Sequence, residues 1–329
     1  MGIGKGTEMG KKVLITASHY EELCGEAKAL FERNGYELVI NQKDMPYYTF
    51  EELSQLVTDV DGVVLGLDEW NEAVFKIAPR LKVLAKFGVG VDYIDLEKAK
   101  EYGIKELNDR GKNANAVAEL AVAFILNAMR QIPWLDGELK EGSWHRFVGR
   151  ELAGKTVGLL GFGDIARRVA KKLSGFDVRL IACDKYPDEE AAKRLNVTMV
   201  SQEELLGESD VVSIHVPNTP DNHHLMDRDA FAMMKQGAYF INTARGGLMD
   251  TEALCDAVES GHLAGAATDV YEYEPLKRGD RILSIPSIIT TPHTGAETSE
   301  VYRAVSLSTA KGVMDVLEGR EPENWVNRW

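Results

Sequence analysis

Cysteine is scarce in this sequence. Cys24, Cys183 and Cys255 are the three cysteines among 329 residues, and they lie far apart in the chain. Such an odd, widely spaced set is not typical of a disulfide framework or of a zinc site. We expect unreactive thiols in a reducing compartment.

Long apolar runs are also missing. Residues 1–12 lack the apolar stretch of a secretory signal peptide, and every apolar run in the chain is far too short to span a bilayer. We therefore expect a cytoplasmic protein without a membrane partner.

Basic residues are outnumbered. The chain has 38 Lys and Arg against 52 Asp and Glu, which gives a formal net charge of -14. Proteins that bind nucleic acid more often carry a positive charge, so we expect no nucleic-acid partner. An anionic small molecule would need a local cluster of positive groups to offset this overall field.

Close sets of metal ligands are absent from the sequence. His223 and His224 are adjacent, and neighbouring side chains on a strand or helix point in different directions. A turn after Thr219-Pro220-Asp221-Asn222 explains this pair better than a metal site does, and we expect no metal.

Short apolar runs alternate with longer stretches of helical spacing. In the first third of the chain, the expected strands are Val13–Thr16, Leu38–Ile40, Gly62–Leu65, Leu81–Phe87 and Ile104–Leu107, and the expected helices are Glu21–Asn34 and Thr49–Thr58. A second set of strands is expected at Val157–Leu160, Val178–Ala182, Val211–Val216, Ala238–Asn242, Gly265–Thr268 and Ile288–Thr290, with helices such as Asp164–Leu173 between them. This alternation predicts an α/β fold with two doubly wound parallel sheets.

Two long helical stretches fit neither set. Asn115–Arg130 is ended by Pro133, and Glu297–Leu317 is followed by Gly319 and Pro322. We interpret both as links between two domains, which a chain of this length can form. The first domain would then be residues 1–109 and 299–329, the second would be residues 110–298, and a ligand-binding cleft is expected between them.

A glycine-rich segment follows the first strand of the second set. Gly161 allows a tight turn, Gly163 lets the backbone approach a pyrophosphate, and the small Ala166 lets helix and strand pack closely. The start of the helix, at Asp164 and Ile165, offers free N–H groups to phosphates. The segment predicts a Rossmann domain that binds a dinucleotide.

An acidic residue ends the next strand. Asp184 lies 21 residues after Gly163, where a carboxylate can accept hydrogen bonds from the ribose 2′-hydroxyl and repel a 2′-phosphate. This favours NAD as the cofactor, although Lys185 leaves the strictness of NAD over NADP open. The alternative is an ordinary glycine turn with Asp184 merely exposed.

Polar residues follow three strands of the second set. Arg245 lies in Phe240-Ile-Asn-Thr-Ala-Arg-Gly-Gly247, Glu274 in Asp269-Val-Tyr-Glu-Tyr-Glu-Pro275, and His293 in Thr290-Thr-Pro-His-Thr-Gly-Ala296. Residues that follow parallel strands gather at one edge of the sheet, so we expect these three side chains to converge. Taken singly, each has a plain alternative: a surface ion pair, a solvated acid and a hydrogen-bonded histidine beside a strand.

These three side chains suit the reduction of a 2-oxo acid. The fork of Arg245 can hold the carboxylate and polarise the carbonyl. His293 can give a proton to the alkoxide as a hydride arrives, and Glu274 can keep the imidazole oriented and protonated. We therefore predict an NAD-dependent oxidoreductase that interconverts 2-hydroxy and 2-oxo acids, a reaction that needs no metal.

Five segments carry a wider resemblance. They are Gly158-Leu-Leu-Gly-Phe-Gly163, His215-Val-Pro-Asn-Thr219, Asn242-Thr-Ala-Arg-Gly246, Asp269-Val-Tyr-Glu-Tyr-Glu-Pro275 and Pro292-His293. Over nearly its whole length the chain resembles the D-isomer-specific 2-hydroxyacid dehydrogenase family. The resemblance implies that Arg245 binds substrate and that Glu274 pairs with His293, the acid and base. The cofactor contacts that it implies are His215, Val216, Pro217, Thr219, Thr243 and Ala244, with Asp269 near the nicotinamide amide.

The resemblance also implies a flavodoxin-like substrate domain. Backbone N–H groups at Val89 and Gly90 would hold the substrate carboxylate, and Asn108 would be a further contact. Lys86 would add charge for a phosphate or a second carboxylate. These residues lie in Lys86-Phe-Gly-Val-Gly90. A structural turn is the alternative explanation for Gly88 and Gly90.

The short phosphoglycerate dehydrogenases are the most similar branch, which makes 3-phosphoglycerate the expected substrate. Hydroxypyruvate or glyoxylate reduction is the alternative activity, and a non-catalytic NAD-sensing protein like the corepressors of this fold is the alternative of another class. The resemblance implies a homodimer. The apolar stretch Ala114–Met129 is either part of that interface or part of the core.

Two features depart from the family pattern. Thr294-Gly-Ala-Glu297 stands where members often have a longer apolar or Gly-rich run, which blurs the inference about the substrate. The sequence ends at Trp329, so we expect no additional regulatory domain.

Overall fold

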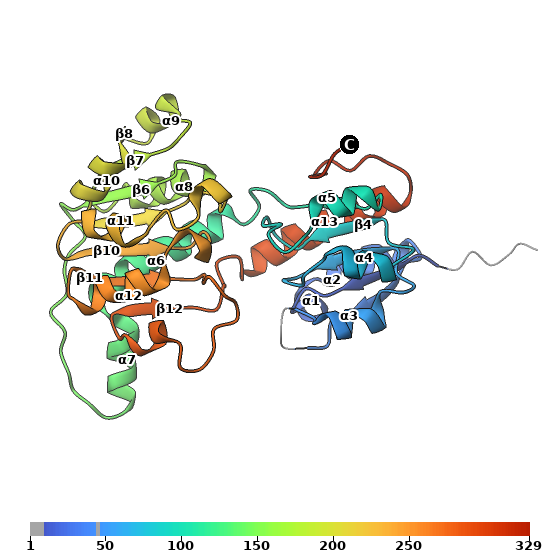
Figure 1. Cartoon of the computed structure of the whole chain (residues 1–329), viewed down its shortest axis with the longest axis horizontal. Coiled ribbons are helices and arrows are strands. Elements are labelled where there is room, and N and C mark those ends of the chain that lie inside the picture. Colours follow the sequence, from blue (N-terminus) through green and yellow to red (C-terminus); the bar gives the residue numbers. More distant parts are fainter. Residues whose placement is uncertain (1–9, 44–46) are drawn as a thin grey trace, which may run out of the picture. The chain divides into compact units, whose positions relative to one another are not determined.

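The computed structural model describes residues 10–43 and 47–329. Residues 1–9, most of the segment examined for a signal peptide, lie outside the described residues. The chain forms two compact units (Figure 1). Unit 1 consists of the residues up to Asn113 together with Glu297–Trp329, and unit 2 is Ala114–Ala296. The boundaries expected from the sequence were 109/110 and 298/299.

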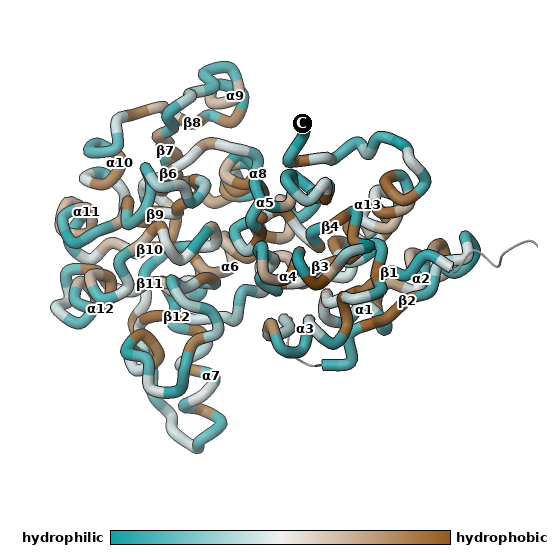
Figure 2. Tube along the Cα trace, turned by 45° about the vertical axis from the view of Figure 1, so that its right-hand side comes forward, coloured by the Kyte–Doolittle hydropathy of each residue, from teal (hydrophilic) through white to brown (hydrophobic). Residues whose placement is uncertain are grey.

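Unit 1 contains a five-stranded parallel sheet in the order β2-β1-β3-β4-β5. The strands are β1 (Lys12–Ile15), β2 (Glu37–Ile40), β3 (Gly62–Leu65), β4 (Val83–Lys86) and β5 (Lys105–Leu107). This is the flavodoxin-like order, and that prediction is confirmed. In Figure 2 much of β1 to β4 is coloured as hydrophobic, as expected for strands buried on both faces.

Helices cover both faces of this sheet. They are α1 (Tyr20–Leu23), α2 (Gly25–Arg33), α3 (Phe50–Leu56), α4 (Glu72–Ile77), α5 (Leu96–Glu101) and α13 (Ser299–Leu317). One apolar layer joins α2 and α13 to the sheet through residues such as Phe31 and Val313, and the other includes Trp70 and Leu53. The single helix expected over Glu21–Asn34 was wrong in detail, since Cys24 interrupts it and separates α1 from α2.

Unit 2 contains a seven-stranded parallel sheet in the order β12-β11-β10-β9-β6-β7-β8. The strands are β6 (Thr156–Leu160), β7 (Arg179–Cys183), β8 (Val197–Met199), β9 (Val211–Ile214), β10 (Ala238–Asn242), β11 (Leu263–Thr268) and β12 (Ile288–Thr290). Counted from β6, this is the Rossmann order with one added strand, which confirms the predicted fold class. The order reverses between β6 and β9, and ligands bind at such a point in open parallel sheets.

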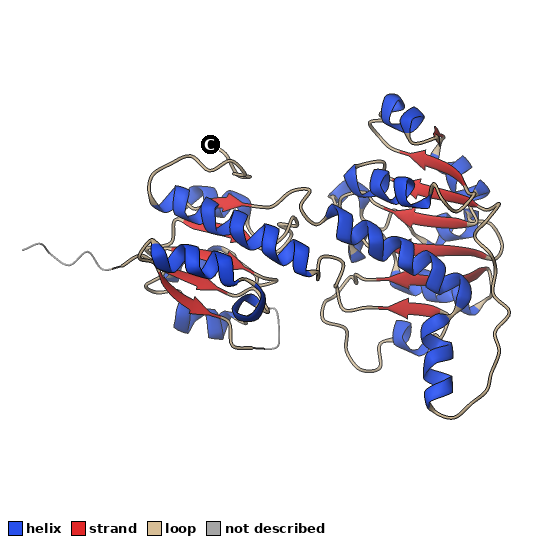
Figure 3. Cartoon of the chain, turned by 180° about the vertical axis from the view of Figure 1, so that it is seen from behind, coloured by secondary structure: helices blue, strands red, loops and turns tan. Residues whose placement is uncertain are grey.

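Helices lie on both faces of this sheet, as Figures 1 and 3 show from opposite sides. They are α6 (Ala114–Arg130), α8 (Asp164–Leu173), α9 (Glu189–Arg194), α10 (Gln202–Glu208), α11 (Arg228–Met233) and α12 (Thr251–Glu259), with short 3-10 turns η1 (Pro220–Asn222), η2 (Gly246–Leu248) and η3 (Arg281–Ser284). Helix α7 (Ile132–Lys140) follows α6, extends away from the sheet and has no buried residue. Helix α6 packs on α8 and on the sheet, with Phe124 and Ile125 in the core. The apolar face of Ala114–Met129 is therefore largely core.

Two local expectations in unit 2 were wrong. Pro133 does not end α6; the helix ends at Arg130, Gln131 takes the left-handed conformation with φ 52°, and Pro133 lies in the first turn of α7. Proline is compatible with that position because its missing N–H would have no helical partner there. Strand β8 was missed because Val197-Thr-Met199 is not a continuous apolar run, and the middle residue, Thr198, is exposed.

Among the described residues, no single helix is long and apolar enough to cross a membrane. Only the bent pair of α6 and α7 reaches that length and composition together.

A carboxyl group is buried in the sheet of unit 1. Glu106 on β5 is fully buried, and within the described part of the chain its two carboxyl oxygens have no hydrogen-bond partner. Burial raises the pKa of Glu106 well above its usual value, and the charge of Lys86 opposes this only in part.

The variant Glu106→Gln is expected to lose less stability than the wild type as the pH rises. Because the folded pKa is raised, the unfolded chain releases this proton first, and wild-type stability falls above the unfolded value by up to about 1.4 kcal/mol per pH unit. Urea unfolding at pH 5 and pH 8 measures the difference. The control is Glu97→Gln on exposed α5, and equal pH slopes for Glu106→Gln and wild type would refute the burial argument.

Candidate active site

The loop between β6 and α8 fits a dinucleotide phosphate. Gly161 has φ 96°, and a Cβ atom there would lie 2.8 Å from the backbone carbon of His215. Gly163 precedes α8 and is exposed, and no other described residue comes within 4 Å of the place a Cβ would take. Within residues 47–329, no side chain caps this end of α8, so its first N–H groups can receive an anion.

Asp184 follows β7 directly and lies against the same loop. Its Oδ2 accepts a hydrogen bond from the backbone N–H of Phe162 at 2.7 Å, and its Oδ1 accepts one from that of Tyr186 at 2.8 Å. The carboxylate is half-buried at the tip of the strand. A ribose diol bound beside this loop would meet acceptor oxygens and a negative charge.

The variant Asp184→Arg is expected to shift the preference between the coenzymes toward NADPH by at least about tenfold, since each close charge reversal is worth on the order of 1.4 kcal/mol or more. The kcat/KM values for NADH and NADPH measure this shift. Asp184→Asn is the matched control, because it removes the charge and keeps an acceptor oxygen. An unchanged ratio in Asp184→Arg would refute the assignment of the ribose contact.

The loop after β9 lies on the other side of the reversal point. The backbone N–H of His215 donates to the carbonyl oxygen of Leu160 at 2.7 Å, which ties this loop to the end of β6. Burial lowers the pKa of His215 to about 4, so its ring is neutral, with Nε2 at 3.0 Å from the Ser213 hydroxyl. Val216, Pro217 and Thr219 continue from here to η1.

Arg245 is held by a turn that follows β10. Asn242, fully buried, accepts the N–H of Ala244 through Oδ1 at 3.0 Å and donates through Nδ2 to the carbonyl of Arg245 at 2.9 Å. The next residue is Gly246, and a Cβ there would lie 1.9 Å from the backbone carbon of Tyr271. The turn therefore packs backbone to backbone on the segment after β11. Thr243, at the base of the turn, has a buried hydroxyl that no other described group contacts by hydrogen bond.

Glu274 and His293 form a close pair. His293 Nδ1 lies 2.8 Å from Glu274 Oε2, and the other oxygen, Oε1, accepts the backbone N–H of Tyr271 at 3.0 Å. Burial acts to raise the pKa of Glu274, but the hydrogen bond and charge of His293, with a contribution from Arg245, hold this pKa below its usual value. With Glu274 ionised, Nδ1 carries a proton and Nε2 is the nitrogen left to exchange one.

Asp269 positions the loop that carries His293. Its Oδ1 accepts the N–H of Thr294 at 2.8 Å, and its Oδ2 accepts that of Gly295 at 2.7 Å. The backbone N–H of His293 also donates to the Asp269 carbonyl at 2.9 Å, and His293 takes a left-handed φ of 54°. A non-glycine residue in this region costs energy that surrounding contacts must offset, and such residues cluster at functional sites. A contact between Asp269 and nicotinamide stays a prediction.

His223 and His224 lie in a turn directly after η1, as expected from the sequence. Their ring centroids are 4.0 Å apart, and His224 takes a left-handed φ of 50°. Among the described residues, no group of His, Cys, Asp and Glu is arranged to hold a metal ion. Reasoning from the sequence missed the hydrogen bond between His224 and Glu272, at 2.6 Å, because turn geometry brings these residues together.

In unit 1, the residues named as substrate contacts lie at the carboxyl end of β4 and after β5. Asn108 donates through Nδ2 to the carbonyl of Val89 at 2.8 Å, which holds the loop after β4. The N–H groups of Val89 and Gly90 have no acceptor among the described residues. Lys86 is buried and donates to the carbonyl of Gly66, and its charge acts on Asp68 and Glu106. It therefore has internal partners.

Comparison with known proteins gives the family. Residues 122–295 match the domain described as D-isomer specific 2-hydroxyacid dehydrogenase, NAD binding domain. The chain is 37% identical to a hydroxypyruvate reductase of Thermotoga maritima, covering 87% of this chain and 95% of that protein. The chain belongs to the D-isomer specific 2-hydroxyacid dehydrogenase family. NAD is the cofactor that this match indicates, and the loop of Gly161 and Gly163 with Asp184 fits it.

Two further similarities extend over most of the chain. A D-3-phosphoglycerate dehydrogenase of Archaeoglobus fulgidus is 35% identical, covering 96% of this chain and 59% of that protein. The chain thus spans little more than half the length of that relative. The TT0316 protein of Thermus thermophilus has a similar structure, with a TM-score of 0.88 and 35% identity, covering 96% of this chain and 99% of that one. The names of these relatives describe oxidoreductases that act on small hydroxy or oxo acids.

Proposed function

We propose that this protein is an NAD-dependent dehydrogenase that interconverts a D-2-hydroxy acid and its 2-oxo acid. The observation that carries the proposal is the 2.8 Å contact between His293 and Glu274, with Arg245 close enough to affect the Glu274 carboxylate. All three groups follow neighbouring strands, β10, β11 and β12, of the sheet whose β6 loop fits the cofactor. In this proposal unit 2 binds NAD and unit 1 contributes to substrate binding.

Each of the three residues has a distinct task in the reduction. NADH, held by the loop of Gly161 and Gly163 and by Asp184, would supply the hydride for the carbonyl carbon. Arg245 binds the substrate carboxylate and draws electron density toward the carbonyl oxygen. His293 gives its Nε2 proton to the oxygen as the C–O π bond breaks, and Glu274 stabilises the imidazole while it is charged. In the oxidation, His293 Nε2 accepts the hydroxyl proton.

The substrate that we propose is 3-phosphoglycerate, with hydroxypyruvate or glyoxylate as the alternative. The relative from Archaeoglobus fulgidus supports the first, and the hydroxypyruvate reductase of Thermotoga maritima, covered over 95% of its length, supports the alternative. In unit 1, we propose the open N–H groups of Val89 and Gly90 as carboxylate donors and Asn108 as their support. A contact of Lys86 with a phosphate stays a prediction.

A panel of substrates tests the activity. NADH oxidation with hydroxypyruvate, glyoxylate, pyruvate and 3-phosphohydroxypyruvate, and NAD reduction with 3-phosphoglycerate, would give kcat/KM for each acid. We expect turnover of at least one acid and a preference of at least about tenfold for the physiological substrate. NADH binding without turnover of any acid would instead support the NAD-sensing alternative.

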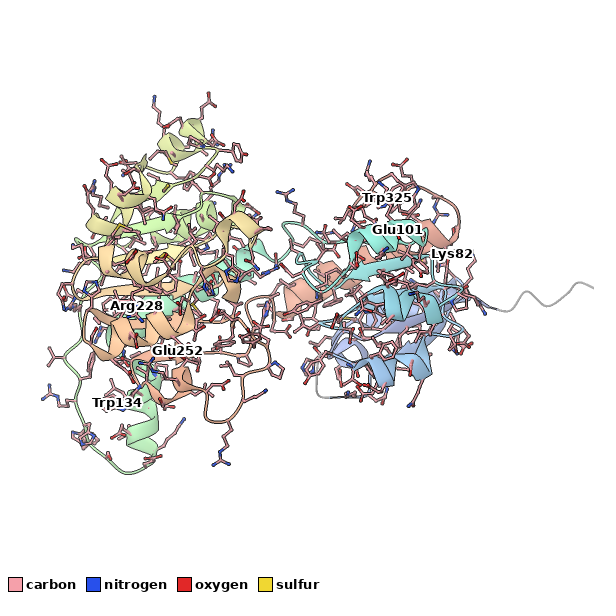
Figure 4. The ribbon with its side chains drawn as sticks, in the orientation of Figure 1. Lys82, Glu101, Trp134, Arg228, Glu252 and Trp325 are labelled. Carbon is pink, nitrogen blue, oxygen red and sulfur yellow. The ribbon has the colours of Figure 1, made fainter. Side chains whose placement is uncertain are left out.

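We also propose a cytoplasmic homodimer. All three cysteines are free, as expected in a reducing compartment. The arm, residues 132–151, carries the exposed apolar side chains Ile132, Leu139, Trp144, Phe147 and Val148, and Trp134 marks its helix in Figure 4. A group of exposed apolar side chains is typical of a protein interface. Analytical ultracentrifugation tests the assembly, and a monomer at micromolar concentration would contradict it.

A further inference from the structure

We propose that His224 and Glu272 act as a positioning pair that fixes the Tyr271 peptide against Glu274 and so holds the acid–base histidine. This inference rests on the proposed dehydrogenase activity. It assigns a task to two residues that are outside the reacting trio.

The pair lies two residues from Glu274 in the segment after β11. His224 Nε2 is 2.6 Å from Glu272 Oε1, and Glu272 Oε2 accepts the backbone N–H of Thr251 at 3.1 Å. Thr251 begins α12, whose first turn is marked by Glu252 in Figure 4. One carboxylate therefore ties the segment after β11 both to α12 and to the loop after η1.

The loop that carries His224 is itself anchored. The backbone N–H of His224 donates to the Gly247 carbonyl at 2.9 Å, and two residues later the backbone N–H of Met226 donates to the Leu248 carbonyl. Gly247 belongs to η2, directly after Arg245 and Gly246. The pair thus lies beside the close contact of Gly246 with Tyr271 and Glu272. A Cβ on Gly246 would lie 2.5 Å from the Glu272 nitrogen.

Two hydrogen bonds connect the peptide next to Glu272 with the ring of His293. The Tyr271 N–H, at the peptide next to Glu272, donates to Glu274 Oε1 at 3.0 Å, and Glu274 Oε2 holds His293 Nδ1 at 2.8 Å. A shift of this peptide would loosen Glu274 without removing any reacting group. The charges of His293 and Arg245 both lower the pKa of Glu274. In this proposal the pair acts through the position of the Tyr271 peptide and its hydrogen bond to Glu274.

The side chains of His224 and Glu272 are partly exposed to solvent. The His224 side chain is 34% exposed and that of Glu272 is 25% exposed, and the ring of His223 lies 4.0 Å from that of His224 in a tilted arrangement. A pair of side chains this accessible to solvent contributes only about 0–1 kcal/mol to stability. Removing it should leave the protein folded, so that an effect on catalysis can be separated from an effect on folding.

The test compares Glu272→Gln, His224→Ala and His224→Gln with wild type. We expect Glu272→Gln and His224→Ala to lower kcat about tenfold or more with NADH affinity unchanged, since misplacement of a reacting group by a fraction of an ångström is costly. The falling limb of the pH profile of reduction should move to lower pH by about half a unit or more, because a loosened Glu274 supports the protonated imidazole less well. His224→Gln keeps an N–H donor for Glu272 and should recover part of kcat.

Glu252→Gln is the matched control. Glu252 lies next to Thr251 in the first turn of α12, but its carboxylate pairs with Arg281 and not with His224. If Glu272→Gln and His224→Ala lower only the melting temperature, and keep the kcat and pH midpoint of the control, the positioning role is wrong. Should Glu272→Gln fail to fold, the comparison of His224→Ala with His224→Gln decides by the same two readouts. A wild type that turns over no 2-oxo acid refutes the proposed function, and with it the inference.

Discussion

The variant His293→Gln is expected to lower kcat for 2-oxo acid reduction by about two to four orders of magnitude, the range that general acid–base catalysis contributes. The glutamine amide is neutral and has no proton to give at neutral pH, whereas the imidazole exchanges one through Nε2. The Asp269 contacts to the loop of His293 come from backbone N–H groups of Thr294 and Gly295, so they remain in the variant. NADH affinity should therefore stay within about twofold, as measured by fluorescence titration beside steady-state kcat.

His262→Gln is the matched control for this change. His262 precedes β11 at the opposite edge of the sheet and contacts Gln236 and the Phe231 carbonyl, so its replacement should leave kcat unchanged. Glu274→Gln should give a smaller loss and move the pH midpoint of reduction downward, because the amide cannot stabilise a charged imidazole. A His293→Gln enzyme with wild-type kcat would mean that another group transfers the proton.

The framework of this site could be predicted from the sequence because it depends on strand order alone. Arg245, Glu274 and His293 each follow a buried run, and the carboxyl ends of parallel strands meet at one edge. Strands β10, β11 and β12 are neighbours in the sheet, so the residues after them start close together. Buried strands and a glycine turn before a helix are local patterns, and these patterns gave the two sheets.

The contacts that tune the site could not be predicted in this way. The left-handed φ values of His224 and His293 are uncommon for residues other than glycine, and no pattern in the sequence marks which histidines adopt them. The hydrogen bonds by which Asn242 holds its turn, and two of those by which Asp269 holds the next loop, are made to backbone groups, which are the same at every position and leave no signal in residue types. The break at Cys24 and the short edge strand β8 were missed for a related reason, since tertiary contacts decide such ends.

The variant Gly246→Ala is expected to abolish most activity and to destabilise unit 2 by about 3 kcal/mol or more, at the upper end of what added atoms in a packed interior cost. The added Cβ would lie 1.9 Å from the backbone carbon and 2.0 Å from the carbonyl oxygen of Tyr271, and backbone atoms cannot rotate away as a side chain can. Either the turn of Arg245 or the segment of Glu274 must then move. Melting temperature and kcat measure the two effects.

Gly247→Ala is the control that separates close packing from a general need for glycine in this turn. Its Cβ would lie 3.1 Å from the Nδ2 atom of Asn218, an exposed side chain that can turn aside. We expect less than about 1 kcal/mol of destabilisation and activity near that of wild type, as for most surface substitutions. If the two alanine variants behave alike, the contact between Gly246 and Tyr271 is not what places Arg245 beside Glu274. If only Gly246→Ala loses activity, the glycine is required because two loops meet there backbone to backbone. The lack of a side chain at position 246 then allows the Arg245 guanidinium to lie near the Glu274 carboxylate.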